Sequence, residues 1–186
     1  QMTLEEAEHS FVLMEKAIST IENLPLPTIG MINGPAMGAG LELALACDLR
    51  IGSNKARLGI PVGKLGITIN NKFAKRIVDL VGPSITKELV YLGRILKAEE
   101  AYALRMLNYV IEEAELDRYA IRMGKLVASM SPASLLAVKR SVNECVNSAP
   151  VLWQGSTPFV DKNDFKEGVA AFVEKRAPKF TRQVKS

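Results

Sequence analysis

The apolar residues at the start of the chain recur at alternating spacings of three and four: Leu4, Ala7, Phe11, Met14, Ile18 and Ile21. This spacing places them on one face and predicts an amphipathic helix. Leucine and proline alternate over residues 24–27, and this run ends the helix because proline cannot continue it. The short apolar run from Thr28 to Ile32 is then expected to be a strand.

A run of small residues follows this strand and leads into a second apolar segment. Residues 33–38 are rich in glycine and other small side chains, which predicts a turn. The helix expected over residues 40–47 is apolar on almost every side, so we expect it to be buried. Two short extended pieces are expected next, at residues 49–51 and 57–60.

Beyond Pro61 the pattern becomes mostly helical. We expect a strand at residues 109–111, a loop at 147–163, and helices over 71–81, 84–92, 97–105, 115–130, 132–146 and 164–176. Gly82-Pro83 is expected to end the first of these helices, and Ser131 to cap the helix that begins at Pro132. Strands separated by helices, followed by further helices, indicate an α/β core with a helical lobe after it. The strands are few and short for a complete sheet, which leads us to expect further elements before the first residue.

Composition narrows the possible classes of protein. The 186 residues suffice for one substantial core, and a net charge of +4 is modest. Basic residues become more frequent toward the C-terminus. A solvated helix end is a simpler interpretation of this cluster than a phosphate-binding site. The basic residues are too sparse, and interleaved aromatic residues too few, for a nucleic-acid-binding protein. No uninterrupted apolar run is long enough to span a bilayer, so we expect no membrane partner.

The cysteine and histidine content excludes two kinds of site. Cys47, Cys145 and the single histidine, His9, cannot supply the four ligands of a typical zinc site, so no metal is expected. A Ser-His-Asp triad would depend on His9, and no nucleophile elbow accompanies it. Both cysteines fall in apolar helical patterns, and we expect buried reduced thiols. The expected location is the cytoplasm, or the mitochondrial matrix if the protein is eukaryotic.

The segment Gly38-Ala39-Gly40-Leu41-Glu42 carries the candidate chemistry. The first turn of a helix leaves backbone N–H groups unpaired and partly positive, which suits an oxyanion or an enolate. Glu42 lies three residues after Ala39, so its carboxylate and the Ala39 N–H can face one pocket. Two structural alternatives stay open at this point. Glu42 could merely complement the helix dipole, and Ala39 and Gly40 could be small only to allow close packing.

Several sequence blocks occur in the order typical of one known family. They are residues 27–34, 38–44, 47–48, 65–66, 93–94, 98–101, 107–108, 131–132, Lys139, 166–168 and 172–176. The first blocks read Pro27-Thr28-Ile29-Gly30-Met31-Ile32-Asn33-Gly34 and Gly38-Ala39-Gly40-Leu41-Glu42-Leu43-Ala44. On these blocks the chain resembles the enoyl-CoA hydratase/isomerase (crotonase) family over nearly its whole length.

The resemblance implies a fold and an assembly. Family members have an α/β core of ββα units followed by a helical trimerisation region. Residues 1–110 would be the C-terminal part of that core, and residues 111–186 the helical region. The implied partners are an acyl-CoA substrate and further copies of the chain in a homotrimer or hexamer. Coenzyme A would enter as part of the substrate, and no separate cofactor is implied.

The resemblance also implies site residues. Two backbone N–H groups stabilise the thioester enolate in this family, and the N–H of Ala39 matches one of them, with Gly38 and Gly40 beside the substrate. The second donor belongs to a segment that would precede this chain. Phe172 and Lys175 match residues that reach the CoA of a neighbouring subunit, although a lysine at a helix end has a structural explanation too.

Two departures from the family pattern bear on the reaction. Glu42 matches the first of two catalytic glutamates, but Val62 stands where the second would follow Pro61. Residues 65–72 also lack the proline- and glycine-rich turn that hydratases usually show. Asn70 and Asn71 in this segment could line the pocket, although Asn71 as the N-cap of the next helix is the simpler interpretation.

Three activities therefore stay open. The chain could be a hydratase-type lyase in which Glu42 works alone as acid and base. It could decarboxylate a malonyl-type thioester, since the family's methylmalonyl-CoA decarboxylases resemble this chain in lacking a glutamate at this place. It could also be a catalytically inactive CoA-binding homologue.

Overall fold

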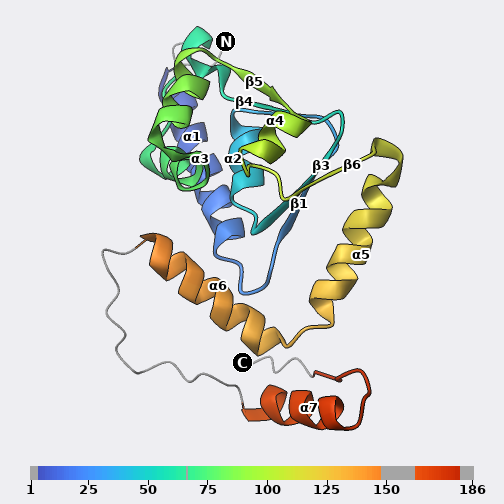
Figure 1. The fold of residues 1–186 in the computed structure, drawn as a ribbon. Helices are drawn as coiled ribbons and strands as arrows, with labels where there is room; N and C mark the ends of the chain where they lie inside the picture. Colours follow the sequence, from blue (N-terminus) through green and yellow to red (C-terminus); the bar gives the residue numbers. More distant parts are fainter. Residues whose placement is uncertain (1–3, 66, 148–161, 181–186) are drawn as a thin grey trace. The chain divides into compact units, whose positions relative to one another are not determined.

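The computed structural model describes residues 4–65, 67–147 and 162–180 (Figure 1). The chain divides into two compact units. The first contains residues 1–24 and 28–120, and the second contains residues 25–27 and 121–186. Most of the loop expected at residues 147–163 lies outside the described ranges.

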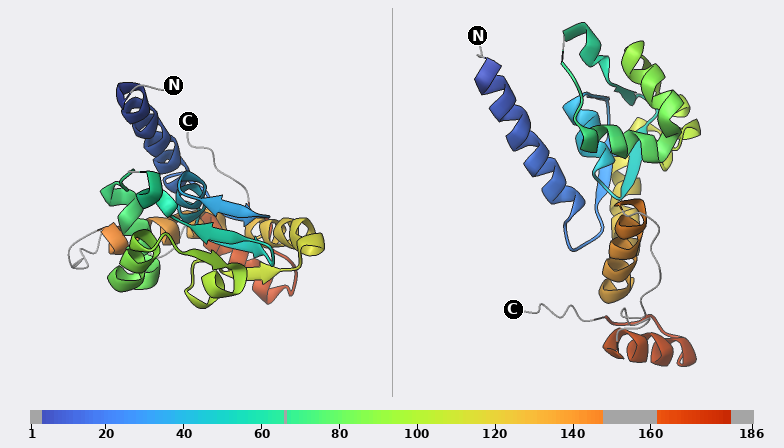
Figure 2. Two further views of the ribbon diagram at one scale, coloured as in Figure 1. Left: turned by 90° about the horizontal axis from the view of Figure 1, so that it is seen from above. Right: turned by 90° about the vertical axis from the view of Figure 1, so that its left-hand side faces the viewer.

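Short strands of the first unit form two small sheets within the described residues. One sheet is parallel throughout, in the order β1 (Ile29–Ile32), β3 (Leu49–Ser53) and β6 (Tyr109–Ile111). These three strands lie side by side in the left view of Figure 2. The other sheet has the order β2 (Pro35–Met37), β4 (Arg57–Gly59) and β5 (Ile95–Lys97). Its first pair is parallel and its second pair is antiparallel.

Four helices of the first unit accompany these strands. They are α1 (Leu4–Glu22), α2 (Ala39–Leu45), α3 (Asn71–Tyr91) and α4 (Ala98–Ala103). Two 3₁₀ turns, η1 (Pro61–Leu65) and η2 (Glu113–Glu115), lie between them and the strands. The succession of two strands and a helix occurs twice, as β1-β2-α2 and as β3-β4-α3. This repetition confirms the ββα units that the family resemblance implies.

Two of the strands were not evident in the sequence pattern. Strand β2 lies inside the small-residue run for which only a turn was predicted. It was missed because its three residues, Pro-Ala-Met, show no alternation of apolar and polar side chains. Strand β5 (residues 95–97) lies between the helices expected over residues 84–92 and 97–105 and overlaps the second only at Lys97. The break predicted at Gly82 is confirmed, since Gly82 at φ +76° interrupts α3 and Pro83 follows it.

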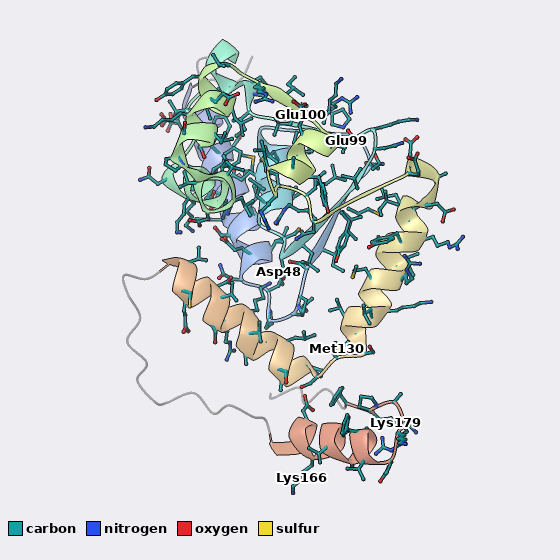
Figure 3. The ribbon with its side chains drawn as sticks, viewed as in Figure 1. Asp48, Glu99, Glu100, Met130, Lys166 and Lys179 are labelled. Carbon is teal, nitrogen blue, oxygen red and sulfur yellow. The ribbon has the colours of Figure 1, made fainter. Side chains whose placement is uncertain are left out.

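The core of the first unit lies where α2, α3 and α4 pack with the strands. Leu41, Leu58, Ile60, Ile77 and Leu96 are fully buried there. Outside this apolar cluster, Asp48 joins the ends of β1 and β3, because its Oδ2 accepts from the Thr28 backbone N–H at 2.7 Å and from Thr28 Oγ1 at 2.9 Å (Figure 3). These contacts tie the residue before β1 to the residue before β3.

Helix α2 is only partly buried. Leu41, Ala44 and Leu45 face the core, whereas Ala39, Gly40 and Leu43 are exposed. The expectation of a helix buried all round was therefore wrong. An apolar helix of seven residues covers the core with one face only, and its first turn stays open.

The regular elements described in the second unit are helices. They are α6 (Pro132–Asn147), α7 (Lys162–Val173) and the larger part of α5 (Leu116–Ala128). Ser131 caps α6 as predicted, because its Oγ accepts from the Ser134 N–H at 3.1 Å. Lys139 is buried on α6, and its Nζ donates to the Leu26 carbonyl at 3.1 Å. None of the helices described, in either unit, is long and apolar enough to cross a membrane.

The expectation of buried thiols was wrong for Cys145. Cys145 is exposed on α6, and Cys47 is half-buried. The apolar side chains Val138, Val142 and Val146 of the same helix are exposed as well. The apolar pattern of α6 therefore does not correspond to a face buried within the described residues.

The turn between β2 and α2 requires glycine at position 38. Gly38 has φ +50° and ψ −115°, a conformation that side chains with a Cβ rarely adopt. Its N–H donates to the Gly59 carbonyl at 3.0 Å and so ties the turn to β4. The geometry of this turn sets where α2 begins.

We expect Gly38→Ala to lower the free energy of unfolding by about 1–3 kcal/mol, because it forces a strained backbone conformation. Gly40→Ala is the matched control, since Gly40 has ordinary helical backbone and an added Cβ meets nothing within 4 Å. The control should be neutral or stabilising by up to about 1 kcal/mol. Urea denaturation of both variants measures the difference, and equal stabilities would contradict the requirement for glycine.

Candidate active site

Glu42 lies in the first turn of α2 and is buried. Its side chain is 3% exposed, although the neighbouring Ala39 and Gly40 are exposed. Gly38 is the N-cap residue and provides no side-chain cap. As the first helical residue, Ala39 has no intrahelical acceptor for its N–H. The turn therefore presents a backbone donor and, one helical turn later, a buried carboxyl group.

The carboxyl group of Glu42 contacts an arginine from another helix. Arg76 Nη1 on α3 lies 3.0 Å from Glu42 Oε1, and the Arg76 side chain is only 6% exposed. A buried guanidinium of this kind needs acceptors for its five N–H donors. The sequence pattern gave no indication of this contact, which joins residues 34 positions apart.

Helix α1 supplies the other acceptors. Glu15 accepts from Arg76 Nη1 at 3.3 Å and from Nη2 at 3.1 Å. Glu22 accepts from Nε at 3.3 Å and from Nη2 at 2.9 Å. Ser19, between them on the helix, accepts from Nη2 at 3.3 Å. We call Glu15, Glu22, Glu42 and Arg76 the carboxylate cluster.

Neighbouring polar groups hold Glu15 in place. Ser19 Oγ donates to Glu15 Oε1 at 2.6 Å, and Asn70 Nδ2 donates to Oε2 at 3.0 Å. The same Asn70 caps α3, because its Oδ1 accepts from the Phe73 N–H at 2.8 Å. The prediction that Asn71 is the N-cap was therefore wrong by one residue. Asn71 is already the first helical residue, and the side chain of Asn70 is the one placed to reach back.

Burial and neighbouring charge act on the two central carboxyl groups in opposite directions. Burial, followed by the adjacent Glu15 carboxylate, raises the pKa of Glu42 from 4.5 to about 7, against the opposing attraction of Arg76. Burial also tends to raise the pKa of Glu15. Hydrogen bonds from Arg76 and Ser19 outweigh that effect and lower the Glu15 pKa to about 2. Glu42 therefore carries a proton over a pH range in which Glu15 is ionised.

Val62 lies in the 3₁₀ turn η1 after Pro61. Its half-buried side chain packs against the apolar core of the first unit. It provides no acid or base. The second carboxyl group beside Glu42 comes instead from Glu15 on α1, a residue that the sequence analysis missed. Glu15, Ser19 and Glu22 at positions i, i+4 and i+7 share one helix face, and this polar stripe was the available signal.

Phe172 and Lys175 lie in the second unit. Phe172 is 86% exposed near the end of α7. Lys175 follows this helix at φ +52°, and its N–H donates to the Phe172 carbonyl at 3.3 Å. The Arg176 N–H donates to the Ala171 carbonyl at 3.0 Å. These two bonds are those of a Schellman motif, so the backbone of Lys175 terminates the helix and its side chain is exposed.

Residues around the end of α7 form a separate set of ion pairs. Arg176 binds Glu167 through Nη1 at 2.6 Å and Glu174 through Nε at 2.5 Å. Lys166 lies on α7, and Lys179 lies beyond the end of this helix (Figure 3). Over residues 4–65, 67–147 and 162–180, no three His, Cys, Asp or Glu side chains are placed to hold a metal ion.

Comparison with known proteins identifies the family. The family model described as enoyl-CoA hydratase/isomerase matches residues 2–183, so the chain belongs to that family. A probable mitochondrial enoyl-CoA hydratase 2 of Arabidopsis thaliana is 36% identical over 179 residues, covering 93% of this chain. The chain spans 60% of the length of that relative.

Solved structures show the same α/β crotonase-like fold. An enoyl-CoA hydratase/carnithine racemase from Magnetospirillum magneticum superimposes with a TM-score of 0.89 at 32% identity, covering 96% of this chain and 68% of that one. A methylmalonyl CoA decarboxylase superimposes with a TM-score of 0.70 at 26% identity, covering 90% of this chain and 68% of that one.

The raised pKa of Glu42 predicts a specific pH dependence of stability. Between pH 4.5 and about 7 the folded protein binds the Glu42 proton more tightly than the unfolded chain does. This contribution to stability is complete below pH 4.5 and is lost as the pH rises through about 7. Glu42→Gln cannot titrate at this position. From pH 5 to pH 8 we therefore expect wild type to lose more stability than the variant in urea denaturation, and parallel curves would contradict the raised pKa.

Proposed function

We propose that this protein is an acyl-CoA enzyme that works through a thioester enolate, and that it is a hydratase-type lyase. The observation that carries the proposal is the buried Glu42 one helical turn after the Ala39 N–H. The N–H of Ala39 would donate to the thioester oxygen as negative charge develops there, with Gly38 and Gly40 leaving room for the substrate. Relatives named as enoyl-CoA hydratases, at 31–36% identity, support the choice of reaction.

A single carboxyl group can serve both proton steps of hydration. Glu42 would take a proton from water as the water oxygen bonds to the β-carbon. Glu42 would then return a proton to the α-carbon of the enolate. General acid–base catalysis is most efficient when the pKa of the group lies near the working pH. A Glu42 pKa of about 7 supplies both forms at neutral pH. With Val62 in place of the second glutamate, we expect this reaction to be slow.

Decarboxylation of a malonyl-type thioester is the second candidate, and Val62 is the observation that favours it. Loss of carbon dioxide leaves its bonding electrons on the α-carbon, so the enolate forms without a base. Glu42 in its protonated form would then deliver a proton to that carbon. The apolar side chain of Val62 would destabilise a substrate carboxylate more than the neutral product. An inactive CoA-binding homologue would bind acyl-CoA without either reaction.

The remaining expectations follow from the family. The acyl-CoA substrate would need no separate cofactor, and copies of the chain would assemble as a homotrimer or hexamer. Phe172 and Lys175 would contact the CoA bound to a neighbouring copy. The location would be the cytoplasm or the mitochondrial matrix, since the relatives include proteins named as mitochondrial.

The hydratase proposal predicts turnover of crotonyl-CoA that depends on Glu42. In the full-length protein, Glu42→Gln should lower kcat by about 10²- to 10⁴-fold, because the amide can neither accept nor donate the proton. Loss of absorbance of the conjugated thioester measures hydration, and circular dichroism confirms that the variant is folded. Hydration that is unchanged in the variant would contradict the role of Glu42.

The same assays separate the alternatives. Carbon dioxide release from malonyl- or methylmalonyl-CoA without crotonyl-CoA hydration would replace the hydratase proposal with the decarboxylase. Tight binding of acyl-CoA with no turnover of any of these thioesters would establish the inactive homologue.

The proposed contact with CoA predicts a selective effect at Lys175. Lys175→Gly keeps the left-handed backbone that ends α7 but removes the ammonium group. If that group binds a CoA phosphate, KM should rise several-fold at constant kcat, because uniform binding is lost. Lys175→Arg is the matched control that keeps the charge. An unchanged KM in the glycine variant would leave Lys175 with its backbone role alone.

A further inference from the structure

The guanidinium of Arg76 serves its three carboxyl partners unequally. Glu15 and Glu22 are each bound through two N–H groups, with distances from 2.9 to 3.3 Å. Glu42 is bound through one, from Nη1 at 3.0 Å, and that same Nη1 also donates to Glu15. Bidentate contacts are stronger and more directional than single ones. Arg76 therefore favours the ionised form of Glu15 and Glu22 more than that of Glu42.

The charges of the cluster do not balance if all three carboxyl groups are ionised. One guanidinium faces three carboxylates. A second cation, Lys72, has its Nζ 3.8 Å from Glu15 Oε1, and its side chain is 63% exposed. A buried uncompensated charge is costly, and a carboxyl group avoids that cost by keeping its proton.

The burial of the three side chains indicates which group keeps the proton. Glu42 is 3% exposed, compared with 18% for Glu15 and 35% for Glu22. Glu15 also accepts hydrogen bonds from Ser19 and Asn70, which stabilise its charged form. Glu42 has the least access to water, accepts a single hydrogen bond from Arg76, and shares Nη1 of that guanidinium with Glu15.

We propose that Glu15 is a positioning residue that, fixed in its ionised form by Arg76, Ser19 and Asn70, holds a proton on Glu42 at neutral pH. Glu15 thereby supplies, from α1, a second carboxyl group beside Glu42 in a chain that has Val62 after Pro61. Its consequence for catalysis rests on the proposed function. A Glu42 that exchanges its proton near pH 7 can give that proton to an enolate, whereas an ordinary glutamate is ionised at this pH.

The proton on Glu42 can be observed without any activity. In full-length protein labelled with ¹³C at the glutamate side-chain carboxyl carbon, Glu42→Gln identifies the Glu42 resonance, and its chemical shift is followed against pH. Glu15→Gln removes the facing charge and keeps the size of the side chain. The Glu42 midpoint should then fall by about one pH unit or more.

Glu22→Gln is the matched control. It removes the same charge from the same guanidinium, but Glu22 binds at Nε and Nη2, whereas Glu42 binds at Nη1. Its effect on the Glu42 midpoint should be clearly smaller than that of Glu15→Gln. A midpoint that is unchanged in Glu15→Gln, or that moves equally in both variants, would overturn the proposal.

A third variant covers the case in which Glu15→Gln does not fold. Glu15→Asp keeps the charge but withdraws it by one methylene group. The Glu42 midpoint should again fall, and an unchanged midpoint would overturn the proposal.

The titration of Glu42 is also independent of the proposed function. If the Glu42 midpoint falls as expected but no acyl-CoA is turned over, the proposed function fails and Glu15 keeps its positioning role. If turnover depends on Glu42 but the Glu42 midpoint does not move in Glu15→Gln, Glu15 has no positioning role.

Discussion

The ion-pair network around Arg76 is the constraint on which the candidate site depends. One guanidinium on α3 connects Glu15 and Glu22 on α1 with Glu42 on α2. Loss of one partner from a buried ion pair typically costs about 3–5 kcal/mol, because the remaining charge is left without compensation. The same contacts that join three helices also determine the protonation of the carboxyl group that we assign to catalysis.

Stability and reactivity are coupled at Glu42. A glutamate in the exposed first turn of a helix would be ionised at neutral pH and would complement the helix dipole. Here burial and the facing Glu15 carboxylate raise the pKa of Glu42 to about 7. The protein thus keeps a buried acid whose proton exchange is adjusted by residues that lie on other helices. Pairs of titratable groups with opposite shifts of this kind are typical of catalytic sites.

The chain departs from its family at the residue that would complete the usual pair of glutamates. Val62 packs against the apolar core and offers no proton. The carboxyl group of Glu15 approaches Glu42 from a different element. Its position in the cluster, held by Ser19 and by the N-cap residue Asn70, is better suited to fixing a charge than to contacting a substrate. This distinction is why we describe Glu15 as a positioning residue.

Much of the fold could be predicted from the sequence, because it depends on local patterns. The spacing of apolar residues in α1, the break at Gly82 and the Ser131 cap of α6 each follow from neighbouring residues, and the structure confirms them. Strands β2 and β5 were missed since three residues are too few to show alternation. Exposure of Cys145 was missed because an apolar helical pattern does not reveal what covers it.

The candidate site divides in the same way between sequence and tertiary structure. By itself, the sequence determined the family, the place of Glu42 three residues after Ala39, and the valine at position 62. Tertiary structure alone decided that Arg76 meets both Glu42 and Glu15. Those contacts join residues separated by 34 and 61 positions, and no local pattern records them. The physical reason is that a pKa depends on burial and on charges nearby in space, and both are set only when the helices pack.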